Sequence, residues 1–207
     1  MFTGIVEQTG MIHEALESNG VLRVSVRPSS MWDDLQLGES IAVNGACLTV
    51  VSSDDVGFEV ELSEETRAKT ADRWSVGNTV NLERSVRAMD RLGGHLVSGH
   101  VDGVGGIVAM ESSGVTITVR IRASPDLARF LVPKGSVAVD GVSLTVVDVG
   151  GPGGTKGDWA ASEFSVCLIP HTVQVTSLKA WRVGVEVNLE ADGVAKYLER
   201  LLAYRGR

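Results

Sequence analysis

Residues 41–51 read I-A-V-N-G-A-C-L-T-V-V, and residues 137–147 repeat the pattern as V-A-V-D-G-V-S-L-T-V-V, 96 positions later. The copies match again where V-G-N-T-V-N-L-E at 76–83 recurs as V-G-V-E-V-N-L-E at 183–190. The offset there has grown to 107, because the second copy carries extra residues around the glycine-rich segment 150–157. Solenoid repeats are only about 20–50 residues long, so this longer period indicates duplication of a whole domain. A chain of this kind can present two similar pockets.

The chain of 207 residues therefore divides into two units and a tail. We expect residues 1–93 to form one small domain, residues 94–191 a second, and residues 192–207 a separate C-terminal segment. Domains of this size bury only about 60–65 % of the surface that their unfolded chains expose. The two units are therefore expected to pack against each other or against neighbouring chains.

The composition narrows the class of protein. A net charge of -7 and a pI near 5.1 disfavour a nucleic-acid partner, because phosphate backbones require a basic surface. No apolar run approaches the ~20 residues that a membrane span needs, and the N-terminus lacks the basic and apolar regions of a signal peptide. Two cysteines are too few for a disulfide framework. We expect a cytoplasmic protein with neither a nucleic-acid nor a membrane partner.

Alternation of apolar with polar residues predicts an all-β fold. Segments with the period of a half-buried strand are 21–26, 56–62, 115–121 and 164–168. Asn19-Gly20 and Ser113-Gly114 precede two of them, at points where a hairpin turn needs positive φ. Each unit thus has about six short strands, which is typical of a small closed barrel with few exposed edges.

Three segments predict helix instead. Residues 30–35 and 124–131 each suggest a short helix inside one unit, the second with Ser124 as a cap and Pro125 at the first helical position. In residues 192–207, apolar residues recur at i, i+3, i+4, i+7 and i+8 from Val194, which predicts an amphipathic helix. Its apolar stripe must be covered, either by its own domain or by helices of neighbouring subunits.

Cys47 and Ser143 occupy the same position in the two copies. Each is followed by Leu-Thr-Val, so Thr49 and Thr145 repeat a hydroxyl on the same face of the strand two residues later. The simplest interpretation of Cys47 is a small buried residue on a barrel strand. A nucleophile-capable side chain in both copies, with Cys in one and Ser in the other, favours two similar pockets with different roles.

His100 lies in the glycine-rich run G-H-L-V-S-G-H-V-D-G at residues 94–103. Gly99 would let a ligand approach the backbone closely, and an imidazole can exchange protons near neutral pH. The alternative is an ordinary core or surface histidine. His95 has no partner at a zinc-like spacing, and no glycine-rich segment has the Gly-Lys-Ser/Thr of a P-loop. We expect neither a metal ion nor a nucleotide cofactor.

Glu65-Thr66 and His171-Thr172 recur at an offset of 106, each after a predicted strand and before a second threonine. They are either the polar edge of a loop or hydroxyls placed to bind a ligand.

Five ordered motifs together resemble one family closely, over essentially all 207 residues. They are M-F-T-G-I-V at 1–6, N-G-A-C-L-T-V at 44–50, G-G-H-L-V-S-G-H-V at 93–101, V-D-G-V-S-L-T-V at 139–146 and L-I-P-H-T at 168–172. The family is that of the riboflavin synthase α chain. The resemblance implies two similar six-stranded Greek-key β-barrels and a C-terminal α-helix, with homotrimers assembled through that helix.

The resemblance also implies an activity. Enzymes of this family convert two molecules of 6,7-dimethyl-8-ribityllumazine into riboflavin and 5-amino-6-ribitylaminouracil, without a metal or redox cofactor. The site forms between the N-terminal barrel of one subunit and the C-terminal barrel of its neighbour. A lumazine synthase capsid is a further candidate partner.

The same resemblance assigns site residues. Cys47 is expected to act as nucleophile or polarising group and His100 as proton carrier for the first molecule, while Ser143 and Thr145 orient the second. The ligand-contacting residues assigned to the first barrel are Gly4, Ile5, Val6, Cys47, Leu48, Thr49, Glu61, Leu62, Ser63, Glu64, Glu65, Thr66, Gly99, His100 and Val101. Those assigned to the second barrel are Lys134, Ser143, Leu144, Thr145, Leu168, Ile169, Pro170, His171, Thr172 and Val173.

Two other classes of function remain open. Lumazine-binding carrier proteins resemble the same family but hold a lumazine or flavin without converting it, since fold does not fix function. A purely structural trimer is the third possibility. The presence of Cys47, His100, Ser143 and Thr145 favours the enzyme.

Overall fold

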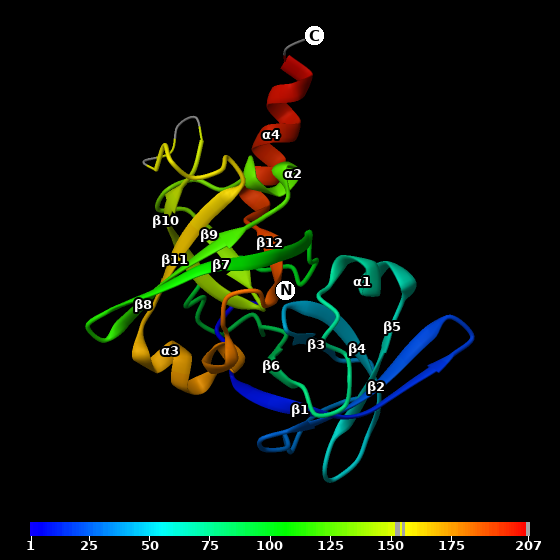
Figure 1. The fold of residues 1–207 in the computed structure, drawn as a ribbon. Helices are drawn as coiled ribbons and strands as arrows, with labels where there is room; N and C mark the ends of the chain where they lie inside the picture. Colours follow the sequence, from blue (N-terminus) through cyan, green and yellow to red (C-terminus); the bar gives the residue numbers. More distant parts are fainter. Residues whose placement is uncertain (152–153, 155, 206–207) are drawn as a thin grey trace.

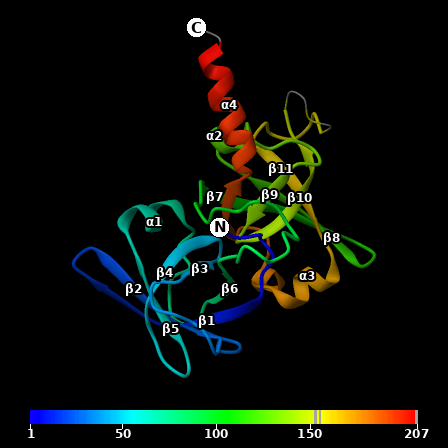
Figure 2. The same ribbon diagram turned by 180° about the vertical axis from the view of Figure 1, so that it is seen from behind.

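The computed structural model describes residues 1–151, 154 and 156–205, and consists of two barrels side by side with a helix projecting from the second (Figure 1). Residues 152, 153 and 155 of the predicted insertion, and residues 206 and 207 of the predicted tail helix, lie outside the described residues. The view from behind shows that the N-terminus lies between the two barrels (Figure 2).

The first barrel is closed by six antiparallel strands. They are β1 (Gln8–Ser18), β2 (Val21–Pro28), β3 (Ser40–Val43), β4 (Ala46–Ser53), β5 (Phe58–Leu62) and β6 (Thr79–Arg84). The strands follow the order β1-β2-β5-β4-β3-β6 around the barrel. Strand β6 returns to lie beside β3 of the β3–β5 meander, which is the Greek-key connection.

The second barrel repeats this topology. Its strands are β7 (Gly103–Ser113), β8 (Thr116–Arg122), β9 (Ser136–Val139), β10 (Val142–Val149), β11 (Glu163–Leu168) and β12 (Glu186–Ala191). Read around the barrel from β7, the order is β7-β8-β11-β10-β9-β12, the same as in the first. Phe58 and Phe164 are fully buried at matching positions in the two separate cores. The predicted all-β fold with two six-stranded Greek-key barrels is confirmed.

The hairpin turns agree with the sequence, with one shift. Asn19 and Gly20 both have positive φ, 52° and 78°, as a two-residue turn of type I′ requires. In the second barrel the turn is Gly114-Val115 rather than Ser113-Gly114, because Ser113 already pairs with Thr116. Gly114 alone has positive φ there.

Two of the three predicted helices form. Helix α2 (Pro125–Ala128) is shorter than predicted, and the Ser124 side chain accepts a hydrogen bond from the Leu127 amide, as a cap does. Helix α4 (Gly193–Arg205) is the predicted tail helix, and an Asp192 carboxylate oxygen accepts from the Val194 amide at 2.9 Å.

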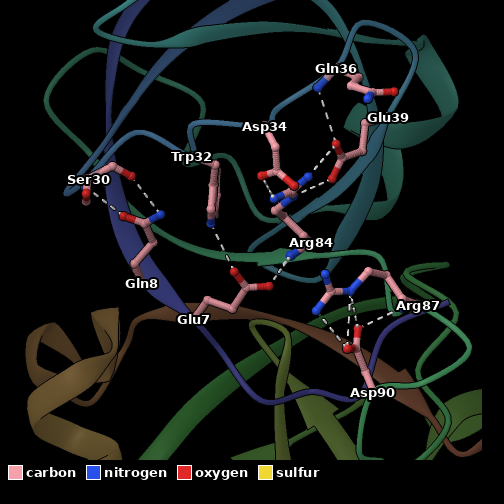
Figure 3. Close-up of polar contacts among 10 residues, drawn as sticks. All are labelled: Glu7, Gln8, Ser30, Trp32, Asp34, Gln36, Glu39, Arg84, Arg87 and Asp90. Atoms are coloured by element: carbon pink, nitrogen blue, oxygen red, sulfur yellow. Dashed lines mark hydrogen bonds and ion pairs between the residues drawn. The ribbon is translucent and has the colours of Figure 1, made fainter.

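The prediction of a helix at residues 30–35 is wrong. Figure 3 shows that this segment is fastened to β1 and its approach instead: Ser30 exchanges two hydrogen bonds with the Gln8 side chain, and the Trp32 indole donates to Glu7 at 3.0 Å. Asp34 is ion-paired with Arg84 of β6 at 2.6 Å. These long-range contacts hold the segment across the end of the barrel as an irregular loop.

Two short helices were not predicted. Helix α1 (Glu64–Lys69) follows β5 and helix α3 (Pro170–Val175) follows β11, with the 3-10 turn η1 (Ser177–Ala180) after it. Ser63 caps α1 through its bond with the Thr66 amide, and Pro170 occupies the first turn of α3. At six residues each they are too short to show a helical period in the sequence.

The barrels meet around a local twofold axis. Strand β3 turns into β4 at Asn44-Gly45, and β9 turns into β10 at Asp140-Gly141, with positive φ at all four residues. A Cβ atom on either glycine would lie 2.7 Å from the amide nitrogen of the other, so the two turns touch back to back. Beside them, Phe2 and Val97 exchange two backbone hydrogen bonds. The two copies of the sequence repeat thus pack against each other through equivalent residues.

Side-chain amides tie the two turns together. Asn81 of β6 donates to the Asp140 carbonyl, and Asn188 of β12 donates to the Asn44 carbonyl, both at 2.9 Å. Asp140 is fully buried, and its carboxylate pairs with Arg73 of the first half and accepts from the Trp181 indole at 3.1 Å. Burial raises the pKa of Asp140, while the Arg73 guanidinium acts in the opposite direction.

Candidate functional site

A short segment precedes each barrel and is gripped by a buried carboxylate of that barrel. The Glu83 carboxylate of β6 accepts from the Thr3 amide at 2.6 Å and from the Gly4 amide at 3.0 Å. The Glu190 carboxylate of β12 accepts from the Ser98 and Gly99 amides at 2.7 and 3.0 Å in the same way. Burial raises the pKa of Glu83, and the donors from residues 3 and 4 counteract that rise.

Each gripped segment lies against the other barrel. The Ser143 amide of β10 donates to the Gly4 carbonyl at 2.8 Å, and the Cys47 amide of β4 donates to the Gly99 carbonyl at 2.8 Å. A Cβ on Gly4 would lie 2.6 Å from the Ser143 Cβ, and a Cβ on Gly99 would lie 2.5 Å from the Cys47 Cβ. Both glycines have positive φ, so no other residue fits easily at either contact.

This exchange corrects the grouping expected from the sequence. Residues 4–6, assigned there to the first barrel, lie with Ser143 of the second, and Val6 packs against the second core. Residues 99–101 lie with Cys47 of the first barrel, as expected, and Val101 packs against the first core. We call the two places the Cys47 seat, around Cys47 and Gly99, and the Ser143 seat, around Ser143 and Gly4. Each is built from both repeats.

The Cys47 seat contains a cavity of about 220 Å³. Its lining comes from β4, from α1 and from the segment before β7, and consists of Ala46, Cys47, Glu65, Thr66, Lys69, Thr70, Gly99, His100 and Val101. Cys47 and His100, singled out in the sequence, therefore share one cavity with Glu65 and Thr66. Sites for drug-sized ligands measure about 300–1,000 Å³, so this cavity holds part of such a molecule and leaves the rest to another surface.

The helix beside the cavity is fixed at its C-terminal end. The Thr70 hydroxyl donates to the Thr66 carbonyl at 2.8 Å, and in the second barrel the Thr176 hydroxyl donates to the Thr172 carbonyl at 2.6 Å. The second threonine of each repeated pair thus closes a helix. Lys69 and Thr70 line the cavity but were missed, because a single exposed lysine carries no pattern in a sequence.

The Ser143 seat has a neighbour that its counterpart lacks. The Ser143 hydroxyl and the Nδ1 atom of His95 lie 2.7 Å apart. His95 is largely buried, and burial lowers its pKa below the usual value, with Asp192 and Glu190 acting weakly in the opposite direction. The imidazole is therefore neutral at pH 7. In the described lining of the Cys47 cavity the only imidazole is that of His100.

The other predicted contacts divide by the direction of their side chains. Thr49 and Thr145 are exposed at matching places on β4 and β10, and Ile169, Pro170 and His171 are exposed at the start of α3. Glu61 is held by Arg23 through an ion pair of 2.6 Å. Four predicted contacts have side chains that point into the barrel cores, so only their backbones can face a ligand: Leu48, Leu62, Leu144 and Leu168.

The remaining predicted residues shape the edges of the two seats. Ser63 and Glu64 form the start of α1, and Ile5 is half exposed beside Gly93. Lys134 has a positive φ of 69°, and its amide donates to the Val146 carbonyl of β10 at 2.8 Å. Thr172 and Val173 lie partly buried in α3, where Val173 packs against the second core.

A larger cavity lies elsewhere. A hollow of about 810 Å³ between the 30–39 loop and the linker after β6 is lined by residues that include Glu39, Arg84, Arg87 and Asp90. Figure 3 shows that these charges are already paired, Arg84 with Glu39 and Arg87 with Asp90. None of the four catalytic candidates lines it. We therefore place the candidate site at the two seats.

Within the described residues, no group of three or more His, Cys, Asp or Glu side chains could hold a metal ion. No helix in the described part of the chain is both long and apolar enough to cross a membrane.

Helix α4 carries its apolar stripe into solvent. Val194, Tyr197, Leu198, Leu201 and Leu202 are between 55 % and 76 % exposed. The helix is anchored in its first half, where Lys196 pairs with Asp102 at 2.6 Å and Glu199 with Arg129 at 2.9 Å. Figure 1 shows it projecting away from both barrels. The stripe is not covered by its own domain.

Comparison with known proteins identifies the relatives of this chain. A family model described as "Lumazine binding domain" matches twice, at residues 3–85 and 98–192. Riboflavin synthase of Mycobacterium tuberculosis (strain H37Rv) is 45 % identical over 213 residues, covering all of both chains. Riboflavin synthase of Photobacterium phosphoreum is 42 % identical over 204 residues, which cover 98 % of this chain and 89 % of the relative.

The solved structures agree on the fold. LumP complexed with 6,7-dimethyl-8-(1'-D-ribityl) lumazine superposes with a TM-score of 0.78, at 22 % identity, over 92 % of this chain and 99 % of that one. The two matches to the family model coincide with the two barrels and their leading segments. With near-complete coverage at 38–45 % identity to curated relatives, the chain belongs to the riboflavin synthase family.

Proposed function

We propose that this protein is a riboflavin synthase, which converts two molecules of 6,7-dimethyl-8-ribityllumazine into riboflavin and 5-amino-6-ribitylaminouracil. The observation that carries the proposal is the pair of matched seats, in which Gly99 meets Cys47 as Gly4 meets Ser143. A reaction between two copies of one molecule requires two similar binding places. Identities of 38–45 % to proteins named riboflavin synthase support the same conclusion.

The reaction moves a four-carbon unit from one lumazine to the other, and its atoms balance without an oxidant or a further reactant. The protein's main contribution is to hold two rings in a reactive stack, where effective molarity can supply roughly 7–11 kcal/mol of the barrier. Cys47 and His100 line one cavity, where they can polarise a bound ring and carry its proton. Ser143 and Thr145 would orient the second ring.

The two seats work together across subunits in this proposal. The cavity at Cys47, at about 220 Å³, is smaller than a typical site for a drug-sized ligand, and the apolar stripe of α4 is exposed. Both features support a homotrimer joined through α4, with the Cys47 seat of one subunit facing the Ser143 seat of the next. Division into units at residues 1–93, 94–191 and 192–207, a cytoplasmic location and association with lumazine synthase are further parts of the proposal.

One assay tests the function. Purified protein incubated with 6,7-dimethyl-8-ribityllumazine alone should produce riboflavin, detected by its absorbance and by chromatography, together with an equal amount of the pyrimidine product. Lumazine that stays bound and fluorescent without conversion would instead indicate a carrier like LumP. Neither binding nor conversion would reject both.

Variants test the assigned roles. Cys47→Ala and His100→Gln should lower turnover while lumazine still binds. Thr145→Ala should also lower turnover, because it removes a hydroxyl that orients the lumazine in the Ser143 seat. Unchanged turnover in all three would reject these roles. Removal of residues 193–207 should reduce the solution mass, and activity should fall with it because the composite site is lost.

A further inference from the structure

The Cys47 seat contains titratable side chains besides His100, the proposed proton carrier. Four titratable side chains line its cavity: Cys47, Glu65, Lys69 and His100. Lys69 is the last residue of α1 and is exposed at the cavity, and it forms no ion pair with any described residue. A lysine ammonium without a carboxylate partner at the wall of a binding cavity is available to a ligand.

The helix of the second barrel has no lysine at the matching position. Helices α1 and α3 are equivalent six-residue elements, closed by Thr70 and Thr176 in the same way, so the last residue of α3, Val175, corresponds to Lys69. The leading segments are equivalent too, because Glu83 and Glu190 grip them alike.

Alignment of the leading segments identifies the counterpart of His100. The residue after Gly99 is His100, and the residue after Gly4 is Ile5. An ammonium and an imidazole in one seat are therefore replaced by two apolar side chains, Val175 and Ile5, in the other. The two seats thus differ at these two positions, while the Ser143 seat carries other titratable side chains, His95 beside Ser143 and His171 in place of Glu65.

We infer that the lumazine in the Cys47 seat is the molecule that loses a proton from its C7 methyl group, and that Lys69 stabilises the anion so formed. The inference rests on the proposed function and deepens it. The C–H bond breaks, its electron pair delocalises through the ring onto the pyrimidine carbonyl oxygens, and the proton passes to the His100 side chain or to water. Lys69 exchanges no proton in this step and acts only through the charge of its side chain.

Simple electrostatics sets the expected size. A unit charge a few ångströms from an ionising group shifts the pKa of that group by roughly 0.7 unit in water and by about 3 units near a protein surface. Because Lys69 is exposed, the lower end applies. A nearby cation favours the anionic ligand, so Lys69 lowers the pKa of the bound C7 methyl group. Glu65 lines the same cavity and acts in the opposite direction.

The chain offers a matched control on the same helix. Arg67 carries the same charge as Lys69, but it is ion-paired with Glu17 of β1 at 3.0 Å and does not line the cavity. Lys69→Met and Arg67→Met therefore remove the same charge from α1, one inside the seat and one outside it.

The experiment measures the pKa of bound 6,7-dimethyl-8-ribityllumazine. Its absorbance is recorded by stopped flow before turnover, with the protein in excess, across a series of pH values. Lys69→Met should raise this pKa by roughly 0.5–1 unit, Lys69→Arg should leave it near the parent value, and Glu65→Gln should lower it. Arg67→Met should cause no shift. Thermal unfolding of each variant confirms that the fold is intact.

Two results would overturn the inference. One is an unchanged pKa in Lys69→Met, and the other is an equal shift in Arg67→Met, which would mean that only the overall charge matters. Failure of the proposed function is a separate outcome, since the parent protein would then form no riboflavin at all. Exchange of the C7 methyl protons in D₂O, followed by NMR, gives a second readout, and Lys69→Met should slow it.

Discussion

Gly45 and Gly141 meet back to back at the local twofold axis, each so close that a methyl group on one would lie 2.7 Å from the backbone nitrogen of the other. The contact is reciprocal because the two turns are the same turn in two copies, and each glycine has a positive φ near 80°. This contact fixes how near the barrels approach each other, and the two seats lie on either side of it.

Alanine at either glycine should therefore destabilise the protein by a similar amount. Gly45→Ala and Gly141→Ala each add a left-handed alanine, at about 1–2 kcal/mol, and an overpacked contact, at about 1–3 kcal/mol. Urea unfolding measures the loss. Gly77→Ala is the control, because Gly77 also has positive φ but nothing lies within 4 Å of its Cβ position. A loss at Gly45 no larger than at Gly77 would contradict the close contact.

Alanine at Gly99 should disturb the Cys47 seat selectively. Its methyl group would overlap the Cys47 Cβ, 2.5 Å away, and push apart two walls of the cavity. We expect lumazine affinity and turnover to fall at least tenfold at a temperature where the variant remains folded, the kind of loss that a 1 Å misplacement causes. Gly38→Ala, with positive φ but open space around it, serves as the control. Normal kinetics in Gly99→Ala would contradict the placement of the site.

Substitution of the two partners of the buried pair Arg73–Asp140 should destabilise the protein by unequal amounts. Asp140→Asn keeps the turn, since Asn44 serves the same turn in the first barrel, and should cost about 1–3 kcal/mol of unfolding free energy. Arg73→Met leaves a buried carboxylate without its cation and should cost more, about 3–5 kcal/mol.

The pH dependence of the Arg73→Met variant follows from the raised pKa of Asp140. Burial raises that pKa, and loss of the arginine raises it further, so the folded state holds the proton more tightly than the unfolded state. Stability is then greatest below the unfolded pKa and falls as pH rises through the folded pKa. Denaturant melts at pH 5 and pH 8 should show the larger cost at pH 8. An equal cost at both would mean that the carboxylate is not desolvated.

His95 should make the folded state sensitive to mild acid. Burial lowers its pKa, so between that value and the unfolded value near 6.5 the unfolded chain binds more protons than the folded one. Unfolding free energy therefore falls as pH drops through this window. His95→Asn removes the titrating group and should flatten the curve between pH 6.5 and 5. The other three histidines are exposed, and His171→Asn provides the comparison.

Much of the fold could be predicted because its signals are local. The turns Asn44-Gly45 and Asp140-Gly141, the alternating strands and the V-N-L-E copies all lie within ten residues, and each has a physical reason. The V-N-L-E copies also supply residues of the interface between the barrels. Asn81 and Asn188 bind the two turns, and Glu83 and Glu190 bind the two leading segments.

The predictions that were wrong or missing concern contacts between residues that are distant in sequence. The sequence suggests a short helix at residues 30–35, yet bonds to Gln8 and Glu7 hold this segment as a loop. The exchange of leading segments was hidden because M-F-T-G-I-V and L-V-S-G-H-V share only a glycine and a valine. The neighbour relation of His95 and Ser143, 48 positions apart, has no sequence signal at all.

The crossing of the leading segments has a consequence for synthesis of the chain. Residues 1–6 leave the ribosome first, but the strand that receives them contains Ser143, which emerges 139 positions after Gly4. Gly99, which forms a wall of the Cys47 seat, is likewise translated after the whole first barrel. A nascent polypeptide that ends before Gly99 carries neither finished binding place: the Cys47 seat gains its wall with Gly99, and the Ser143 seat is completed only when Ser143 follows.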